Sequence, residues 1–302
     1  MAYDAGPLFC DLALGERIER AEAELIATGS RAALARIGAD KGADTAGDNG
    51  FVTPLAGGVA CCTEEGSPLN KVAGLGFAGV PGADELGAVE RQFAARGVPV
   101  QVELAHLADP ALGEVLTARG YRLVGFENVL GRALRPGGGA EGRSASPGEC
   151  APPRTPGVEV RHSGEDGLAE WLDAVVGGFA APDTQGVPSH EEFPRDILER
   201  AVRDMTAASG MRRYVARVDG AVAGGASMRI GEGIAQLTGA ATLPAYRRRG
   251  VQSALLAVRL AEAAAQGCDL AVITTQPAST SQQNAQRRGF GLLYTRAVLV
   301  KS

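Results

Sequence analysis

The chain has 302 residues, of which 45% are hydrophobic and 22% charged, and its formal net charge at pH 7 is -5. This length predicts two domains of ordinary size, and the acidic balance excludes a bulk basic surface for nucleic acid. The N-terminus lacks a basic region followed by a long apolar core, and no apolar run is long enough to span a bilayer. We therefore expect a cytoplasmic protein that contacts neither nucleic acid nor membrane.

The first half of the chain, residues 1–134, ends in a recognisable order of elements. A helical pattern over Asp84–Ala95 precedes an apolar strand pattern over Val98–Leu104. The half then closes with LTARGYRLVGFENVLGRAL, Leu116–Leu134, which predicts a short helix, a glycine turn and a strand. Residues Arg135–Gly157 are rich in Gly, Pro and Ser without apolar periodicity, and this is typical of an interdomain linker.

The second half, residues 158–302, repeats that order. A helix over Val251–Ala265 precedes a strand over Asp269–Thr275, and NAQRRGFGLLYTRAVLVKS, Asn284–Ser302, closes the half in the same way. Recurring order at this spacing indicates an internal duplication. Upstream, the pair Asp219-Gly220 between two apolar segments predicts a β-hairpin. The full order, β-α-α-β-β-β-α-β-α-β, predicts an α/β fold with a mixed, mostly antiparallel sheet flanked by helices.

The segment ATLPAYRRRGVQSALLAVRL, Ala241–Leu260, places three arginines and a glycine where a strand gives way to a helix. The backbone N–H groups from Arg248 to Ala254 have no partners inside such a helix, and the helix dipole favours an anion there. Gly250 permits close approach, and the arginines can add charge-assisted hydrogen bonds to phosphate. The turn therefore predicts a pyrophosphate site, although a solvated basic turn gives the same pattern.

The order strand, Pro-x-Tyr-Arg-x-Arg-Gly, helix, strand, Ser-x-x-Asn-x-x-x-x-Gly-Phe resembles the GCN5-related N-acetyltransferase (GNAT) superfamily over the whole second half. The resemblance implies two tandem GNAT-like domains, at 1–134 and 158–302 with a linker at 135–157, and acetyl-CoA as cosubstrate without a metal. It also implies that backbone amides of the turn bind the coenzyme A pyrophosphate. The implied binding residues are Thr242, Leu243, Arg247, Arg248, Arg249, Gly250, Val251, Gln252, Ser253, Ala254 and Asn284.

Two positions depart from the family pattern. Gln252 stands where the family has Gly or Ala, and Ala285 stands where many relatives carry a Tyr that protonates the leaving thiolate. Tyr294 on the next strand is the candidate substitute acid, with a packed core aromatic as the alternative. Asn284 occupies the family's place beside the pantetheine arm.

The implied reaction is direct acyl transfer from the thioester to an amine. An alkyl amine with a pKa of about 10.4 must first lose a proton. Glu232, at the start of the strand before the motif, is the candidate base, and a solvated turn residue is the alternative. A strand N–H near Thr242 or Leu243 is expected to polarise the thioester carbonyl. The acceptor is a small-molecule or peptide amine, and the segment Phe179–Phe193 is expected to shape its pocket.

The first half lacks arginines in its equivalent turn, GFAGVPGADELG, and we interpret it as a degenerate repeat. A rival pattern, G-x-G-x-x-G at Gly74–Gly79 with Glu103 downstream, is a weak indication of a dinucleotide site. The five cysteines and three histidines lack metal-ligand spacing. Two functions stay open: an N-acetyltransferase, or a non-catalytic acyl-CoA-binding or sensing protein. The assembly is expected to be a monomer or a homodimer.

Overall fold

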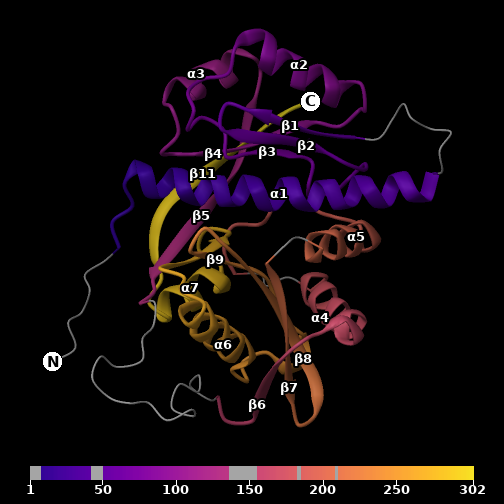
Figure 1. Ribbon diagram of the computed structural model, residues 1–302, viewed down its shortest axis with the longest axis vertical. Helices are drawn as coiled ribbons and strands as arrows, with labels where there is room; N and C mark the ends of the chain where they lie inside the picture. The colour runs from indigo at the N-terminus through magenta and orange to yellow at the C-terminus, as the bar shows by residue number, and fades with distance from the viewer. Residues whose placement is uncertain (1–7, 42–49, 136–154, 182–184, 208–209) are drawn as a thin grey trace.

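Both halves of the chain contribute to one continuous sheet. The computed structural model describes residues 8–41, 50–135, 155–181, 185–207 and 210–302 (Figure 1). The eleven strands lie in the order β1-β2-β3-β4-β11-β5-β10-β9-β8-β7-β6. Their bounds are β1 Phe51–Leu55, β2 Gly58–Cys62, β3 Lys71–Ala73, β4 Val100–Ala105, β5 Arg122–Ala133, β6 Val158–His162, β7 Met211–Val218, β8 Ala221–Gly231, β9 Ile234–Thr242, β10 Leu270–Thr275 and β11 Gly291–Lys301.

Helices cover both faces of this sheet, as expected for a mixed α/β fold. The helices are α1 Leu12–Lys41, α2 Ala83–Ala94, α3 Ala111–Ala118, α4 Leu168–Phe179, α5 Arg195–Thr206, α6 Val251–Ala265 and α7 Thr280–Arg287, with 3-10 turns at Glu165–Gly167 and Pro244–Tyr246. Within the described ranges, no helix is both long and apolar enough to cross a lipid bilayer.

The last strands of the two halves are exchanged. Strand β5, from the first half, lies between β10 and β11 of the second half, antiparallel to both. Strand β11, from the second half, lies between β4 and β5 of the first. The expected pair of separate sheets is therefore replaced by one sheet in which each half completes the other.

Helix α1 ties the two halves together across the middle of the sheet (Figure 1). Its first turn is capped by Asp11, whose carboxylate accepts from the N–H of Leu14 at 2.8 Å. Ile18 and Ala21 pack against residues of β4, β5, β9, β10 and β11. Further along, Ile26 and neighbouring residues pack on β2, β3 and α5. Burial of this one helix therefore depends on both halves being present.

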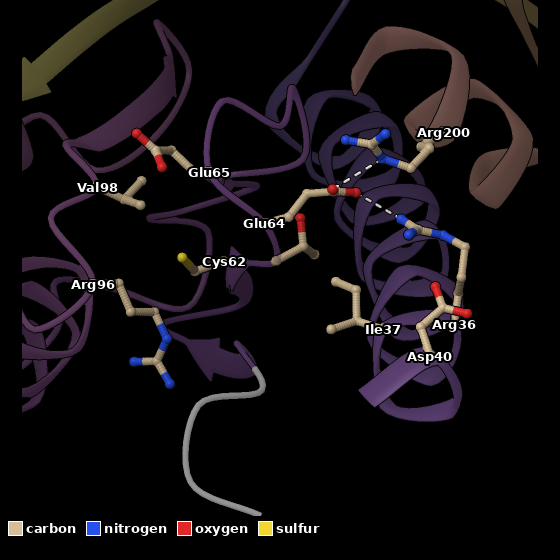
Figure 2. Close-up of a pocket in the computed structure, with 10 residues that line it drawn as sticks. Arg36, Ile37, Asp40, Cys62, Glu64, Glu65, Arg96, Val98 and Arg200 are labelled. Carbon is tan, nitrogen blue, oxygen red and sulfur yellow. Dashed lines mark hydrogen bonds and ion pairs between the residues drawn. The ribbon is translucent and has the colours of Figure 1, made fainter. Parts of the chain in front are cut away.

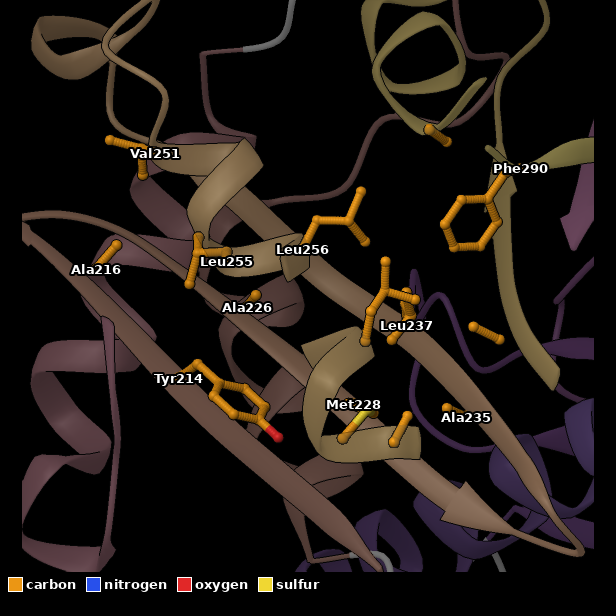
Figure 3. Close-up of a cluster of buried hydrophobic side chains, with 14 of the residues drawn as sticks. Tyr214, Ala216, Ala226, Met228, Ala235, Leu237, Val251, Leu255, Leu256 and Phe290 are labelled. Atoms are coloured by element: carbon orange, nitrogen blue, oxygen red, sulfur yellow. The ribbon is translucent and has the colours of Figure 1, made fainter. Parts of the chain in front are cut away.

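The opposite face is covered separately in each half. In the first half α2 and α3 pack on β1–β4 around Phe93, Leu112 and Leu116. In the second half α6 packs on β7–β10 around Leu255, Tyr214 and Met228 (Figure 3). This second core fixes the position of the first turn of α6, which follows the arginine segment.

The local sequence signals are confirmed. Helix α6 spans the expected Val251–Ala265, and β10 begins one residue later than expected. The hairpin between β7 and β8 turns at Asp219 and Gly220, which both have positive φ (52° and 81°) as a type I′ turn requires. Most of the proposed linker, residues 136–154, lies outside the described residues, so the domain boundaries stay a prediction.

The strand exchange predicts that the halves depend on each other. A protease site inserted within residues 136–154 should give two fragments that co-elute on size exclusion, because each contains a strand bonded inside the other. A fragment of residues 158–302 alone lacks β5, so β10 and β11 lose their shared neighbour. We expect it to show no cooperative urea transition. A native-like transition of that fragment would contradict mutual dependence.

Candidate functional site

Strands β9 and β10 are parallel and paired only at one end. They pair with each other over Ile234–Gln236 and Leu270–Val272. Beyond this point β9 continues to Thr242 and β10 to Thr275 without pairing with each other. The opening of the sheet beyond Gln236, which we call the β9–β10 split, exposes backbone along two strands. Splits between neighbouring strands are unusual because they give up ladder hydrogen bonds, so they mark places where a ligand can pair with backbone.

Strand β9 bulges within this split. Ser227 of β8 pairs with Thr238, and Gly225 pairs with Ala241, so two residues of β9 oppose one of β8. Gly239 in the bulge has φ of +57°, and a Cβ there would lie 2.7 Å from the Ser227 hydroxyl. A bulge leaves one residue without its ladder partner and redirects its N–H group.

The arginine turn leads from the end of β9 into α6. Arg248 and Gly250 both adopt left-handed backbone conformations, with φ of +61° and +81°. Among described residues, none of the N–H groups from Arg248 to Ser253 donates a hydrogen bond. The Ala254 N–H, by contrast, donates to the Gly250 carbonyl at 2.9 Å. Six consecutive N–H groups therefore lie without a described acceptor at a helix N-terminus, where an anion is favoured, whereas Ala254 contributes no free donor.

The three arginines have different surroundings. The Arg247 guanidinium donates to the Ala181 carbonyl at the end of α4. Arg249 pairs with Asp219 at 2.9 Å and lies 5.9 Å from the centre of the Tyr246 ring. Arg248 is exposed and makes no side-chain hydrogen bond or ion pair with a described residue. Of the three, Arg248 therefore presents the charge that is open to a ligand.

The remaining predicted binding residues gather around the same turn. Asn284 on α7 donates from Nδ2 to Oε1 of Gln252 on the first turn of α6. The unusual Gln252 is thus held by the residue expected beside the pantetheine arm. Thr242 and Leu243 end β9 next to α4, but the Leu243 N–H already donates to the Ala223 carbonyl at 3.0 Å.

Ala285 stands where many GNAT proteins carry a tyrosine, and its side chain is buried. Ala285 is 1% exposed within the core that α6 forms with the sheet. A larger side chain at this position would point into that core.

The predicted base, Glu232, lies at the far end of β9. It sits in the β8–β9 hairpin with φ of +50°, and Arg20 donates to its carboxylate at 2.8 Å. These hydrogen bonds hold the pKa of Glu232 below its usual range. At about 3.3 Å per residue, the length of β9 places Glu232 roughly 30 Å from the arginine turn. Neither position nor basicity favours Glu232 as the proton acceptor.

The predicted acid, Tyr294, is buried on the α1 face of the sheet, the face that α1 covers. It is 5% exposed, and its hydroxyl donates to Glu19 at 2.7 Å. Arg296 donates to the same carboxylate oxygen at 2.8 Å. Burial and the charge of Glu19 raise the pKa of the Tyr294 hydroxyl well above its usual value. This arrangement favours the packed-aromatic alternative.

Sequence reasoning missed a cluster of charged residues on the α1 face, where the halves meet. Lys71 on β3 pairs with Glu103 on β4, and Glu127 on β5 lies 3.8 Å from Arg296 on β11. A partial signal was alternation: Glu103 stands between Gln101 and Ala105, which are buried on the same face of β4, and Glu127 stands two residues before the buried Val129 of β5. The strand exchange that brings them together has no such local signal.

The equivalent turn of the first half is blocked. The N–H groups of Gly76 and Ala78 both donate to the Ala56 carbonyl. Asp84 and Glu85 occupy the first turn of α2, where negative charge opposes an anion. The expected degeneracy of this half therefore has a physical basis.

The rival dinucleotide pattern also lacks its required context. Gly79 precedes α2, which begins only at Ala83, whereas the third glycine of that fingerprint belongs at the start of the helix. Glu103 is buried and paired with Lys71 and is not available to a ribose.

A cavity of about 550 Å³ lies elsewhere, between α1, the end of β2, the loop before β4, and α5 (Figure 2). Its carboxylate Glu64 is held between Arg36 at 2.6 Å and Arg200 at 3.0 Å. Among the described residues that line it, none belongs to the first turn of a helix or to the arginine turn. Within the described part of the chain, no group of three or more His, Cys, Asp or Glu is placed to hold a metal ion.

Comparisons with known proteins bear on the family resemblance of the second half and on the overall fold. Residues 180–291 match the sequence profile of the Acetyltransferase (GNAT) family. No curated protein matches the chain. A GCN5-related N-acetyltransferase from Kribbella flavida has a similar structure, with 20% identity, a TM-score of 0.58, and coverage of 91% of this chain and 95% of that one.

A tandem GNAT protein from the clavulanic acid biosynthesis pathway, without acetyl-CoA, gives 12% identity, a TM-score of 0.53, and coverage of 84% and 78%. A GCN5-related N-acetyltransferase from Sphaerobacter thermophilus gives 16% identity, a TM-score of 0.50, and coverage of 76% and 71%. At these identities the likeness establishes the fold, including its tandem arrangement.

The buried hydroxyl of Tyr294 gives a stability prediction. Tyr294→Phe should lower the free energy of unfolding in urea by about 1–3 kcal/mol, because Glu19 loses a buried donor. Tyr214→Phe is the matched control, since the Tyr214 hydroxyl donates to Glu262 at 2.8 Å in the other core. If Tyr294 only packs, both variants keep their turnover. A selective loss of turnover in Tyr294→Phe would restore its role as acid.

Proposed function

We propose that the second half of the chain, in which residues 180–291 match the Acetyltransferase (GNAT) family, transfers an acetyl group from acetyl-CoA directly to a primary amine. The acceptor is a small molecule or a peptide. The observation that carries this proposal is the run of N–H groups from Arg248 to Ser253 that have no acceptor among the described residues and that follow the unpaired end of β9.

In this proposal acetyl-CoA, the acetyl donor, binds with its pyrophosphate at the arginine turn and its thioester farther along the split. The pyrophosphate accepts from the N–H groups of the turn, with Arg248 adding charge-assisted hydrogen bonds. The pantetheine arm then runs along the split, where its amide groups can pair with the free edge of β9. Asn284 and Gln252 flank this path as a bonded pair. Acyl-CoA specificity beyond acetyl is not fixed by any of these contacts.

The thioester carbonyl needs a hydrogen-bond donor in the transition state. The Leu243 N–H is already used by Ala223. The bulge at Gly239 and Ala240 is the better source, because a bulged residue has no ladder partner. Holding the amine against the thioester can contribute roughly 7–11 kcal/mol to catalysis, so the reaction does not depend on a tyrosine acid.

A second candidate function rests on Ala285. Because the position of the family's usual acid is buried, an acyl-CoA-binding or sensing protein without turnover is consistent with the same turn. The two functions share donor binding and differ only in release of free thiol in the presence of an amine.

The donor site predicts a graded response to changes at Arg248. Calorimetric titration with acetyl-CoA should show binding that Arg248→Glu weakens roughly tenfold to a hundredfold, because hydrogen bonds to charged groups contribute about 1.5–3 kcal/mol. Arg248→Gly should weaken it less, because glycine keeps the left-handed backbone and its N–H while losing only the side chain.

Arg161→Glu is the matched control, because Arg161 is an exposed arginine of the same half on β6. It should leave binding unchanged. Equal affinity in Arg248→Glu and wild type would refute the pyrophosphate assignment. Binding without thiol release across a panel of primary amines would select the sensing function.

A further inference from the structure

Strand β5 brings one carboxylate of the first half to the open end of the β9–β10 split. Asn128 pairs with Thr275, the last residue of β10, so Glu127 lies one position beyond the end of that strand. On its other side Glu127 pairs with Arg296 of β11. If the parallel register of Leu270 with Ile234 is continued, Thr275 stands level with Gly239 in the bulge of β9.

Glu127 faces the α1 side of the sheet. It lies two residues before Val129, which packs with Ile18 of α1, and alternate residues share a face. Two residues before Glu127, a Cβ on Gly125 would lie 3.4 Å from Nδ1 of His190. His190 belongs to the segment expected to shape the acceptor pocket. The same segment is hydrogen-bonded to the loop that follows β10, because the Val187 N–H donates to the Pro277 carbonyl at 3.1 Å.

Glu127 differs from its charged neighbours in being incompletely paired. The cation of Lys71 is committed to Glu103, and Arg296 is committed to Glu19 at 2.8 Å, against 3.8 Å to Glu127. The Glu127 side chain is 20% exposed, whereas that of Glu103 is 4% exposed. It is therefore the carboxylate of this cluster that a ligand can reach.

The surroundings also set its proton affinity. Burial, together with the charges of Glu103 and Glu22, outweighs Lys71 and Arg296 and raises the pKa of Glu127 to about 7. Glu19 and Tyr294, bonded beside Arg296, and His190 and Glu191, from the loop across this face, are further titratable groups near the cluster. A carboxylate with such a pKa exchanges protons efficiently near neutral pH.

We propose that Glu127, supplied by the exchanged strand of the first half, binds the ammonium group of a cationic primary amine and takes its proton. This rests on the proposed acetyl transfer. One ammonium proton passes to the Glu127 carboxylate and then to water. The neutral nitrogen attacks the thioester carbon, the C–N bond forms, the C–S bond breaks, and the second nitrogen proton goes to the departing sulfur.

The spacing suits this role. Strands β9 and β5 are at least two strand separations apart, at least roughly 10 Å, because β10 lies between them and β9 is no longer paired with β10 at this level. An amine that enters from the α1 face occupies that interval, with its nitrogen between the bulge and Glu127, directly or through one water. The first half thereby completes the acceptor side of a site whose donor side belongs to the second half.

The test compares Glu127→Gln and Glu127→Asp in the full chain. The probes are acetyl-CoA with putrescine, tyramine or a lysine-containing peptide, and thiol release is followed against pH. Wild-type kcat/KM, which reports the free enzyme, should rise with pH and level off above a midpoint near 7. Glu127→Gln should lower kcat roughly 10²-fold and abolish that midpoint, while Glu127→Asp restores part of both.

Glu90→Gln is the matched control. Glu90 also pairs with a residue of β11, Lys301 at 2.9 Å, but on the opposite side of the first half. It should keep the wild-type rate and profile. Calorimetry with acetyl-CoA on each variant separates the two proposals: a wild type that does not bind sinks the proposed function. A wild type that binds and turns over while Glu127→Gln matches its rate and profile sinks the inference alone.

If none of the three amines is acetylated, the protonation of the Glu127 carboxyl is measured directly. Infrared difference titration of wild type against Glu127→Gln should show a carboxylic acid band lost with a midpoint near pH 7. Added putrescine, as a bound cation, should shift that midpoint downward. A difference spectrum without a titrating band, or one unaffected by putrescine, would overturn the inference.

Discussion

The backbone pairing of β5 with β10 and β11 is the constraint on which the rest of the structure depends. Once β5 lies between them, the second half cannot close its own sheet, and β11 must pair with β4. Helix α1 then packs across the joint, adding Arg17–Asp269 and Arg36–Asp204 to the connection. The chain is a duplication in sequence and a single unit in its hydrogen bonding.

The buried charges at this joint set the register more than they add stability. Arg296 and Glu19 are each 1% exposed, and a buried ion pair is often no more stable than an apolar pair of the same size. Removing one partner, however, leaves an uncompensated charge that costs about 3–5 kcal/mol. A one-residue slip of β11 would turn Arg296 into the opposite core. The pair therefore disfavours wrong pairings of two strands with similar apolar patterns.

The limits of sequence reasoning follow the same division between local and long-range structure. Helix α6, the Asp219-Gly220 hairpin and the arginine turn depend on neighbours within a few residues, and the sequence predicts all of them. The strand exchange depends on pairings between residues more than a hundred positions apart, which apolar patterning does not encode. Residue type and closeness to the motif point to Glu232 and Tyr294. Their partners, Arg20 and Glu19, lie on α1, far away in sequence.

The exchange also explains how one half can lose its ligand turn and still be required. In the first half, the Ala56 carbonyl occupies two N–H groups of the turn, and the acidic residues of α2 disfavour an anion there. In a pair of independent domains such a half would contribute nothing to the other's chemistry. In this chain β5, the last strand of the first half, pairs with β10 up to the last residue of β10. Side chains of β5 near that point, such as Glu127, therefore lie beside the second half. The closed turn of the first half and the strand that joins the second half's sheet lie on different elements, the segment before α2 and β5, so one can change without the other. A substitution in β5 therefore bears on the second half's site, whereas one in the closed turn bears only on the packing of the first.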